Sequence, residues 1–300
     1  MASSAEVFGG GTAVITGAAA GIGAGLARHA ALALGMSVVL ADVDAAGLER
    51  TCADISDDGG RVVPAVVDVR DADAVQRLAD RVARESGPVR LLVNNAGVQQ
   101  FGFLWDTPVA NWERLVSINV NGVFHGVRAF MPRLIAQTER AWVLNLASIG
   151  SVTAWPLQTP YIMSKHAVLA MTECLHQEVE LIGARHIQVG AVLPGAVSSR
   201  IFDDAGGVDT GDLTAADTER EAMFRVRERA ISPEEAAATI LQQAADGEFY
   251  IVTQPESVLG AMRDRADQLT ARRAPAAPRS RFAAPGPDEH GSPHAVTTRR

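Results

Sequence analysis

Residues 12–23 read TAVITGAAAGIG. The first five form a short apolar run rich in β-branched side chains, which is typical of a strand, and an Ala- and Leu-rich helical segment after the glycines reaches about Leu34. A second apolar run at residues 37–41 ends on Asp42. The order of strand, glycine turn, helix, strand and acidic residue predicts a βαβ unit.

The same alternation continues along the chain. Strands that alternate with helices of ten or more residues predict an α/β fold, a Rossmann-like doubly wound parallel sheet of about seven strands with helices on both faces. Pro132 is expected to kink or shorten the longest helix. The further strands are expected at residues 61–67, 89–93, 141–146, 186–192 and 249–253, and the helices at residues 45–55, 72–84, 109–137, 160–182 and 215–229, with one more starting at Ser232.

Composition and charge limit the possible partners. The 300 residues are 47% hydrophobic and 21% charged, which is ordinary for a globular protein. The formal net charge is −8, and the last thirty residues carry six Arg and two acidic residues, so the rest of the chain is at −12. An acidic body argues against nucleic acid as the main partner and does not suit an anionic membrane surface. Since neither a signal-peptide pattern nor an apolar run of about 20 residues is present, a cytoplasmic protein is expected.

The cysteines predict no disulfide. Cys52 and Cys174 are the only two, and both lie in apolar, helix-like runs. Two buried free thiols are therefore expected, which fits a reducing compartment. No His–Cys spacing typical of zinc accompanies them, so no metal is expected.

The glycines and Asp42 predict a nucleotide site. Gly17, Gly21 and Gly23 lie where the strand ends and the helix begins, so the backbone can approach a pyrophosphate and the helix N terminus can offer N–H groups. Their spacing, G-x-x-x-G-x-G, is by itself also compatible with a tight turn in any α/β protein. Asp42 lies 19 residues after Gly23, where a carboxylate can accept from ribose hydroxyls and would repel a 2′-phosphate. Positions 18–20 and 43 hold no Arg or Lys, so the expected cofactor is NAD rather than NADP.

The chain has a single lysine. Lys165 follows Tyr161, one of only two tyrosines, by four residues. On a helix the two side chains would lie on one face, and a nearby ammonium favours the phenolate and lowers the pKa of the tyrosine. The pair predicts a general acid/base tuned toward neutral pH.

Other chemistries lack their sequence patterns. No G-K-[ST] phosphate loop and no G-x-S-x-G nucleophile elbow is present. A lone lysine could instead form a Schiff base, but such a site needs neither the glycine turn nor Asp42.

Seven motifs in order along the chain resemble those of the short-chain dehydrogenase/reductase family, in its short single-domain branch. The resemblance covers residues 8–260. Each motif is weak alone, but their order and spacing together are specific. They are the turn from Thr16 to Gly23, Asp68-Val69, NNAG at residues 94–97, NVNG at 119–122, Ser148 thirteen residues before Tyr161, YxxxK at 161–165, and Pro194-Gly195.

The resemblance implies a catalytic set within a single dinucleotide-binding and catalytic domain, residues 1–271. Tyr161 would exchange the proton of the alcohol, and Lys165 would lower the pKa of the phenol and bind the nicotinamide ribose. Ser148 would bind the substrate oxygen, and Asn119 would hold a water that links Lys165 to solvent. The NAD-binding set would be Gly17, Gly21, Ile22, Gly23, Asp42, Asp68, Val69, Asn95, Ala96, Tyr161, Lys165, Pro194, Gly195, Val197 and Ser199.

Three features depart from the family. Ser199 stands where a threonine is frequent, and the glycine-rich ending after the last strand is replaced by YIVTQP at residues 250–255. Residues 272–300 have no family counterpart, and their Pro, Ala and Arg content predicts a disordered tail. The long helices at residues 109–137 and 160–182 match the family's four-helix dimer contacts, so a homodimer or homotetramer is expected.

An apolar lining predicts the class of substrate. Phe101, Trp155 and Phe202 are expected to contact the substrate together with Ser148 and Tyr161. Such a pocket suits a hydrophobic secondary alcohol or ketone, terpenoid, steroid or polyketide-like, of secondary metabolism. Preference for NAD favours oxidation. Three alternatives stay open: the aromatic residues are core or dimer contacts, the protein is a non-catalytic redox sensor, or it is an NADPH-linked ketoreductase.

Overall fold

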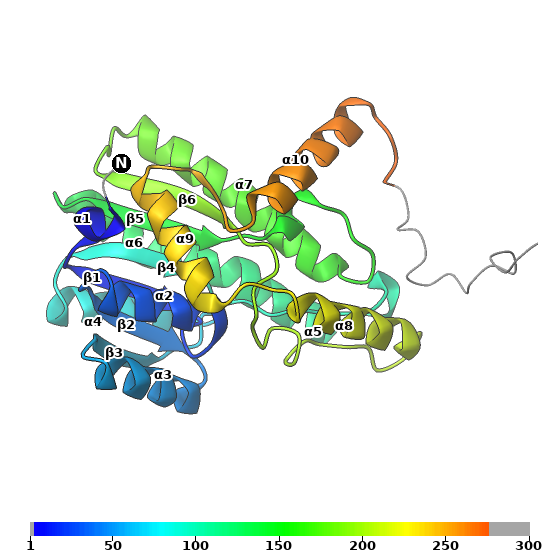
Figure 1. Ribbon diagram of the computed structural model, residues 1–300, viewed down its shortest axis with the longest axis horizontal. Coiled ribbons are helices and arrows are strands. Elements are labelled where there is room, and N and C mark those ends of the chain that lie inside the picture. Colours follow the sequence, from blue (N-terminus) through cyan, green and yellow to red (C-terminus); the bar gives the residue numbers. More distant parts are fainter. Residues whose placement is uncertain (1–2, 276–300) are drawn as a thin grey trace, which may run out of the picture.

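One parallel sheet organises the molecule. The computed structural model describes residues 3–275. Within them, seven parallel strands lie in the order β3-β2-β1-β4-β5-β6-β7, which confirms the predicted doubly wound, Rossmann-like fold (Figure 1). The strands are β1 (Thr12–Thr16), β2 (Ser37–Asp42), β3 (Arg61–Val66), β4 (Val89–Asn94), β5 (Ala141–Leu146), β6 (Ile187–Leu193) and β7 (Tyr250–Val252).

The strand order reverses between β1 and β4. Every residue of β1 and of β5 is buried, as expected for strands with both faces covered. After β3 the chain returns to the other side of β1 and continues outward to β7. The connections that follow β1 and β4 therefore diverge, which opens a crevice at the carboxyl ends of these two strands.

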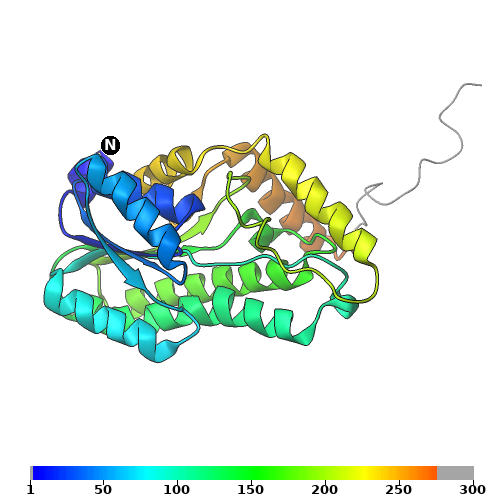
Figure 2. The same cartoon turned by 90° about the horizontal axis from the view of Figure 1, so that it is seen from below.

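Helices cover both faces of the sheet. One layer holds α2 (Gly21–Leu32), α3 (Ala45–Asp57) and α9 (Pro233–Ala245), and the other holds α4 (Ala72–Glu85), α6 (Gly122–Ala136) and α7 (Thr159–Leu181). Figure 2 shows the two layers on opposite sides of the strands. The short helix α1 (Ser4–Phe8) adds Phe8, whose ring lies 4.5 Å from that of Trp142 at the amino-terminal edge of the sheet.

The long helix expected at residues 109–137 is divided. It consists of α5 (Val109–Val116), a π-helical turn (Ser117–Asn121) and α6. Pro132 lies inside α6 without ending it, so the prediction that Pro132 shortens the helix is wrong. The interruption lies at the π-helical turn, a feature that is frequent at functional sites.

The C-terminal part contains one helix that the sequence analysis missed. After the short 3-10 turns η1 (Leu104–Asp106) and η3 (Ile149–Val152), α8 (Leu213–Arg227) starts two residues before its predicted position. The unpredicted helix is α10 (Pro255–Thr270), whose one fully buried side chain, Val258, packs in the cluster beside η3. Val258, Met262, Ala266 and Leu269 recur at helical spacing, so the sequence did carry a signal for this helix. The predicted disordered tail lies outside the described residues except for its first four positions.

The two thiols are free, as expected. Cys174 is exposed and Cys52 is only half-buried, so the prediction of two buried thiols is wrong. The buried stripe of α7 includes Val168, Thr172, Leu175 and Val179, and Cys174 lies off that stripe. Within residues 3–275, no helix is both long and apolar enough to cross a bilayer.

Candidate active site

The glycine turn between β1 and α2 leaves no room for side chains. Gly17 and Gly21 have φ values of 67° and 56°, in the left-handed region. A Cβ atom on Gly23 would lie 2.1 Å from the carbonyl oxygen of Gly17. No side chain caps the N terminus of α2, so the N–H groups of its first turn remain available to an anion. This turn can therefore hold a pyrophosphate.

The turn is anchored to β4 by Asn95. Its Nδ2 donates to the carbonyls of Thr16 (2.9 Å) and Gly17 (3.0 Å). The hydroxyl of Thr16 in turn accepts from the backbone N–H groups of Asn95 (3.0 Å) and Ala96 (3.2 Å). Asn95 thus fixes the floor of the cleft, and both Asn95 and Ala96 line it.

Asp42 lies at the end of β2, on the wall of the same cleft, whose volume is about 590 Å³. Its carboxylate accepts from the backbone N–H groups of Ala19 and Asp44, both at 3.0 Å. These bonds orient the carboxylate and leave lone pairs for a further donor. Arg200, on the loop after β6, lies 3.6 Å from Asp44 and also lines the cleft.

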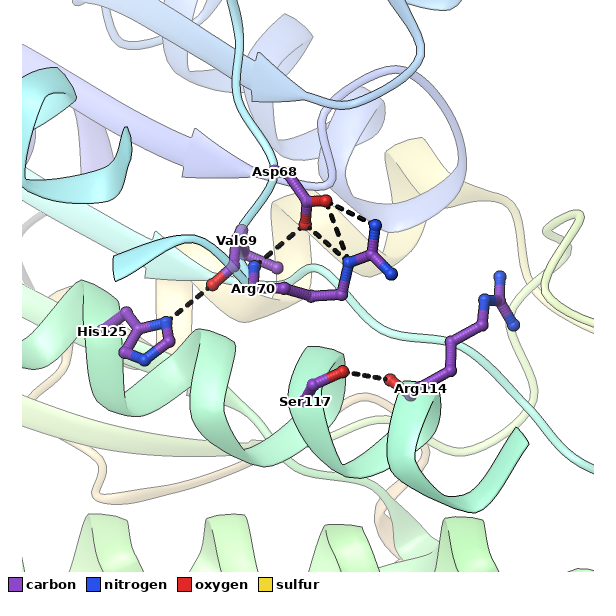
Figure 3. A network of polar contacts seen from close by, with 6 residues as sticks. All are labelled: Asp68, Val69, Arg70, Arg114, Ser117 and His125. Carbon is purple, nitrogen blue, oxygen red and sulfur yellow. Dashed lines mark hydrogen bonds and ion pairs between the residues drawn. The ribbon is translucent and has the colours of Figure 1, made fainter. Parts of the chain in front are cut away.

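Asp68 and Val69, after β3, are held by two residues that sequence reasoning missed (Figure 3). The guanidinium of Arg70 donates to Asp68 from Nε (2.9 and 3.0 Å) and Nη2 (2.6 Å), and this bonding holds the pKa of the carboxyl below its usual value. The carbonyl of Val69 accepts from His125 Nδ1 of α6 at 2.8 Å. Arg70 and Arg114 of α5 both line the cleft at this end. The proximity of Arg70 to Asp68 in the sequence was the one available signal.

Ser148 and Tyr161 meet beside Gly150. A Cβ atom on Gly150 would lie 3.3 Å from Ser148 Oγ and 3.4 Å from Tyr161 Cε1. Burial raises the pKa of Tyr161, and its hydrogen bond with Ser148 acts in the opposite direction. The lowered pKa expected from a neighbouring ammonium is therefore not the net result in this structure, because desolvation of the phenolate is the larger effect.

Lys165 lies one helical turn after Tyr161. Its Nζ is 5.6 Å from the centre of the Tyr161 ring and donates to the carbonyl of Leu146, at the end of β5, over 2.7 Å. The side chain is 5% exposed, and burial lowers its pKa to about 8. A Cβ atom on Gly97 would lie 3.6 Å from this Nζ, so the lysine adjoins the far end of the cleft.

Asn119 belongs to the π-helical turn and is fully buried. Its Oδ1 accepts from the N–H of Val98 (2.8 Å), and its Nδ2 donates to the carbonyl of Val98 (2.9 Å) and to Ser164 Oγ (3.0 Å). Both N–H donors of the amide are thus used, and Oδ1 keeps one lone pair with which it can accept from a water linked to Lys165. The structure assigns the side chain to joining the loop after β4 to α7.

Pro194 and Gly195 form a turn after β6 that Gln254 holds. The N–H of Gly195 donates to Gln254 Oε1 (2.9 Å), and Gln254 Nε2 donates to the carbonyl of Ala196 (2.7 Å). Val197 is buried beyond this turn, and Ser199 approaches the glycine turn, where a Cβ atom on Gly21 would lie 3.0 Å from Ser199 Cβ. Gln254 belongs to the segment that departs from the family pattern, and its role in the turn was not predicted.

The predicted substrate residues differ in how exposed their side chains are. Phe101 is 0% exposed and packs with Phe202, their ring centres 6.2 Å apart, in a cluster beneath α8. Phe101 is therefore part of a packed core rather than of an open wall, which corrects its predicted place. Trp155 is 41% exposed. Phe202 is partly buried at the edge of the cluster.

The fold and the site together define a class of protein, an α/β dinucleotide-binding enzyme. The phosphate turn and Asp42 line one cleft, and the Ser148–Tyr161–Lys165 group adjoins it where Lys165 Nζ lies beside Gly97. Within residues 3–275, no group of three His, Cys, Asp or Glu side chains is placed to hold a metal ion.

Comparison with known proteins defines the family. The short chain dehydrogenase family matches residues 11–206, and the chain belongs to this family. It is 32% identical over 228 residues to the probable oxidoreductase EphD of Mycobacterium tuberculosis, with 74% of this chain matched, and it spans 38% of the length of that relative. It is 30% identical to the 1-deoxy-11-beta-hydroxypentalenate dehydrogenase of Streptomyces arenae, over 95% of this chain and 94% of the relative.

Solved structures agree with this family assignment. A short chain dehydrogenase/reductase from Burkholderia phymatum in complex with NAD has a TM-score of 0.86 at 33% identity, with 91% of this chain and 99% of that chain covered. A metagenomic short-chain oxidoreductase in complex with NADP has a TM-score of 0.64 at 27% identity, with 82% and 96% covered. A nicotinamide dinucleotide is therefore the cofactor class of this fold.

Proposed function

We propose that the protein is an NAD-dependent dehydrogenase that oxidises a hydrophobic secondary alcohol to the ketone, with Tyr161 as general acid/base. The observation that carries this proposal is the meeting of Ser148 and Tyr161 beside Gly150, with Lys165 at the far end of the nucleotide cleft. A protein that only sensed the redox state of a dinucleotide would not need these three side chains together.

Each residue has a separate task in this proposal. Hydride acceptance is the chemistry that bound NAD supplies. The hydroxyl of Ser148 donates to the substrate oxygen and places it beside the phenol. The phenolate of Tyr161 takes the proton of the alcohol as the carbinol carbon loses its hydride. Lys165 uses one donor on Leu146 and offers its others to the nicotinamide ribose.

Asp42 supports NAD over NADP. Its carboxylate is fixed by two backbone N–H groups at the end of β2, where it would accept from the ribose hydroxyls and repel a 2′-phosphate. One observation favours the alternative of an NADPH-linked ketoreductase. Arg70, Arg114 and Arg200 all line the cleft, although Arg70 is engaged by Asp68 and Arg200 by Asp44.

The surroundings of Tyr161 support an apolar substrate. Leu157 lies four residues before it and is buried, and Trp155, six residues before it, exposes part of its ring. The Streptomyces relative is named for a hydroxylated substrate, which fits oxidation at a carbinol carbon.

The test is a panel of secondary alcohols of graded size, assayed with NAD and with NADP, for the wild type and Tyr161→Phe. We expect turnover of apolar alcohols with NAD, and a loss of about 10²–10⁴-fold in kcat in the variant, because the ring remains but the proton acceptor is gone. Binding of NADH, followed by its fluorescence, should persist, weakened by no more than the loss of the contact of the phenol hydroxyl, and shows that the variant is folded.

Three outcomes would contradict the proposal. Cofactor binding without turnover of any alcohol would favour a redox sensor. A higher kcat/KM with NADP would refute the reading of Asp42. Full activity of Tyr161→Phe would remove the phenol from the mechanism.

A further inference from the structure

The buried face of α8 contains a carboxylate. Ala215, Ala216, Ala222 and Met223 form a helical stripe against the cluster of Phe101 and Phe202, and Glu219 lies in the middle of this stripe. Glu219 is 3% exposed. Glutamate is almost never fully buried unless it is paired or hydrogen-bonded, because loss of its hydration is costly. Its position therefore requires a specific partner.

That partner is a run of buried amides. Gln158 Nε2 donates to Glu219 Oε1 over 2.7 Å, and Gln158 Oε1 accepts from Gln99 Nε2 over 2.9 Å. Gln99 Oε1 accepts from the backbone N–H of Gln100 over 2.9 Å. Gln99, Gln158 and Glu219 are all almost fully buried, and we call them the amide–carboxylate chain.

The amide–carboxylate chain joins three segments, one of which leads directly into Tyr161. Gln99 lies on the loop after β4, Gln158 immediately precedes α7, and Glu219 lies on α8. The carbonyl of Gln158 accepts from the N–H of Ile162 (3.0 Å), which closes the first turn of α7 around Tyr161. The amide–carboxylate chain thus connects α8 to the backbone that carries the phenol of Tyr161.

The backbone before α7 is held in a costly conformation. Leu157 has a φ value of 64°, which is rare for a residue with a side chain. Its carbonyl accepts from the N–H of Gly102 over 2.9 Å, and the next residue is Gln158. Such a conformation persists only where the surroundings impose it. The constraints are the hydrogen bond from Gly102 to Leu157 and the amide–carboxylate chain at the next residue, Gln158.

Apart from its bonds in the amide–carboxylate chain, α8 packs against loops. Figure 1 shows it beyond the carboxyl ends of the strands. Arg220 donates to the carbonyl of Ala205 (3.0 Å) and lies 5.9 Å from the ring centre of Phe101. The stripe is mostly alanine, so its apolar contribution is small and the buried polar bonds weigh more in placing the helix.

We propose that Glu219 is a positioning residue whose carboxylate fixes α8 to the start of α7 and thereby sets the placement of Tyr161. This inference rests on the proposed function of Tyr161. None of the three residues of the amide–carboxylate chain lines the nucleotide cleft, which α8 reaches through the bond of Arg227 to the carbonyl of Ser199, so we expect loss of the amide–carboxylate chain to affect alcohol turnover more than cofactor binding.

A reciprocal exchange of charge tests the proposal. In Gln158→Glu, two carboxylates face each other and the donor to Glu219 is lost. In the double variant Gln158→Glu/Glu219→Gln, the new carboxylate accepts from Gln99 and from the new amide, so the bonding is restored with its direction reversed. We expect the single variant to raise hydrogen-exchange rates of the α8 amides and to lower kcat/KM, each by about tenfold or more, and the double variant to recover both to within about threefold.

The controls separate this role from general damage. Glu221→Gln removes a charge from the exposed face of the same helix and should change neither exchange nor kcat/KM. NADH affinity should change less than kcat/KM in every variant, since none of the substituted residues lines the cleft. If Gln158→Glu does not fold, Glu219→Ala removes the acceptor instead and should show the same increase in α8 exchange.

Hydrogen exchange keeps the result independent of turnover. Unchanged exchange of α8 in Gln158→Glu or in Glu219→Ala, or a double variant no better than Gln158→Glu, would overturn the proposal. If no alcohol is turned over even by the wild type, the proposed function fails, while the exchange data still decide whether Glu219 fixes α8.

Discussion

Burial favours the neutral forms of both Tyr161 and Lys165. It raises the pKa of the phenol and lowers that of the ammonium to about 8. Without cofactor and substrate, the pair is therefore less charged than its sequence spacing suggests. Positive charge or hydrogen-bond donors brought to the site would favour the phenolate of Tyr161, whereas hydrogen-bond acceptors would favour the ammonium of Lys165.

The lowered pKa of Lys165 makes a prediction about stability. Its folded pKa lies below the value of 10.5 for a free lysine, so the unfolded chain binds more protons between these two pH values. The destabilising effect of the buried ammonium is fully present below about pH 8 and is relieved as the pH rises. Relative to Lys165→Met, the wild type should gain about 2 kcal/mol in free energy of unfolding between about pH 7 and about pH 9.5.

Urea unfolding at several pH values measures this difference. Because the free energy of unfolding is compared between the wild type and Lys165→Met at each pH, the titration of groups that both proteins share cancels. A difference that does not change with pH would show that Lys165 keeps an ordinary pKa in the folded protein.

The β1–α2 element depends on Gly23 more than on any of its side chains. In Gly23→Ala the new Cβ would meet the carbonyl of Gly17 at 2.1 Å and Asn95 Nδ2 at 2.6 Å, so the turn must open. We expect a loss of about 1–3 kcal/mol in stability from overpacking, and NADH binding weakened by about tenfold or more because the N–H groups are displaced.

Gly260 in α10 is the matched control. A Cβ atom there has no neighbour within 4 Å, and the residue lies inside a helix. Gly260→Ala should therefore stabilise the protein by about 0.5–1 kcal/mol and leave NADH affinity unchanged. Equal effects of the two substitutions would contradict the account of the turn.

The surface of the whole molecule predicts self-association. Val109 of α5 and Phe124 and Ile135 of α6 are exposed, Phe124 at 50%, on helices that the family resemblance assigns to a dimer. Exposed apolar side chains gathered on neighbouring helices mark an interaction surface. Sedimentation equilibrium should show at least a dimer for the wild type and a shift toward monomer for Phe124→Asp. A monomeric wild type would refute this prediction.

Periodicity and motif spacing determined much of the protein. The alternation of strands and helices is local, so it predicted the parallel sheet, and the bounds of β1, β2 and α7 were nearly correct. The residue types at positions 17–23, 42, 148, 161 and 165 are also local information, and they identified the family. The π-helical turn left no such signal in the sequence. The helix α10 did leave one, in the spacing of Val258, Met262, Ala266 and Leu269, which was overlooked.

Only the tertiary structure decided what depends on contacts between distant segments. Gln99, Gln158 and Glu219 are up to 120 residues apart, and no pattern in the sequence pairs them. The burial of Phe101 beneath α8 and the position of Gln254 below the Gly195 turn have the same origin. The direction of the pKa shift of Tyr161 also depends on tertiary contacts. The sequence spacing places a lysine nearby, but the packed surroundings determine whether its charge or desolvation has the larger effect on the pKa.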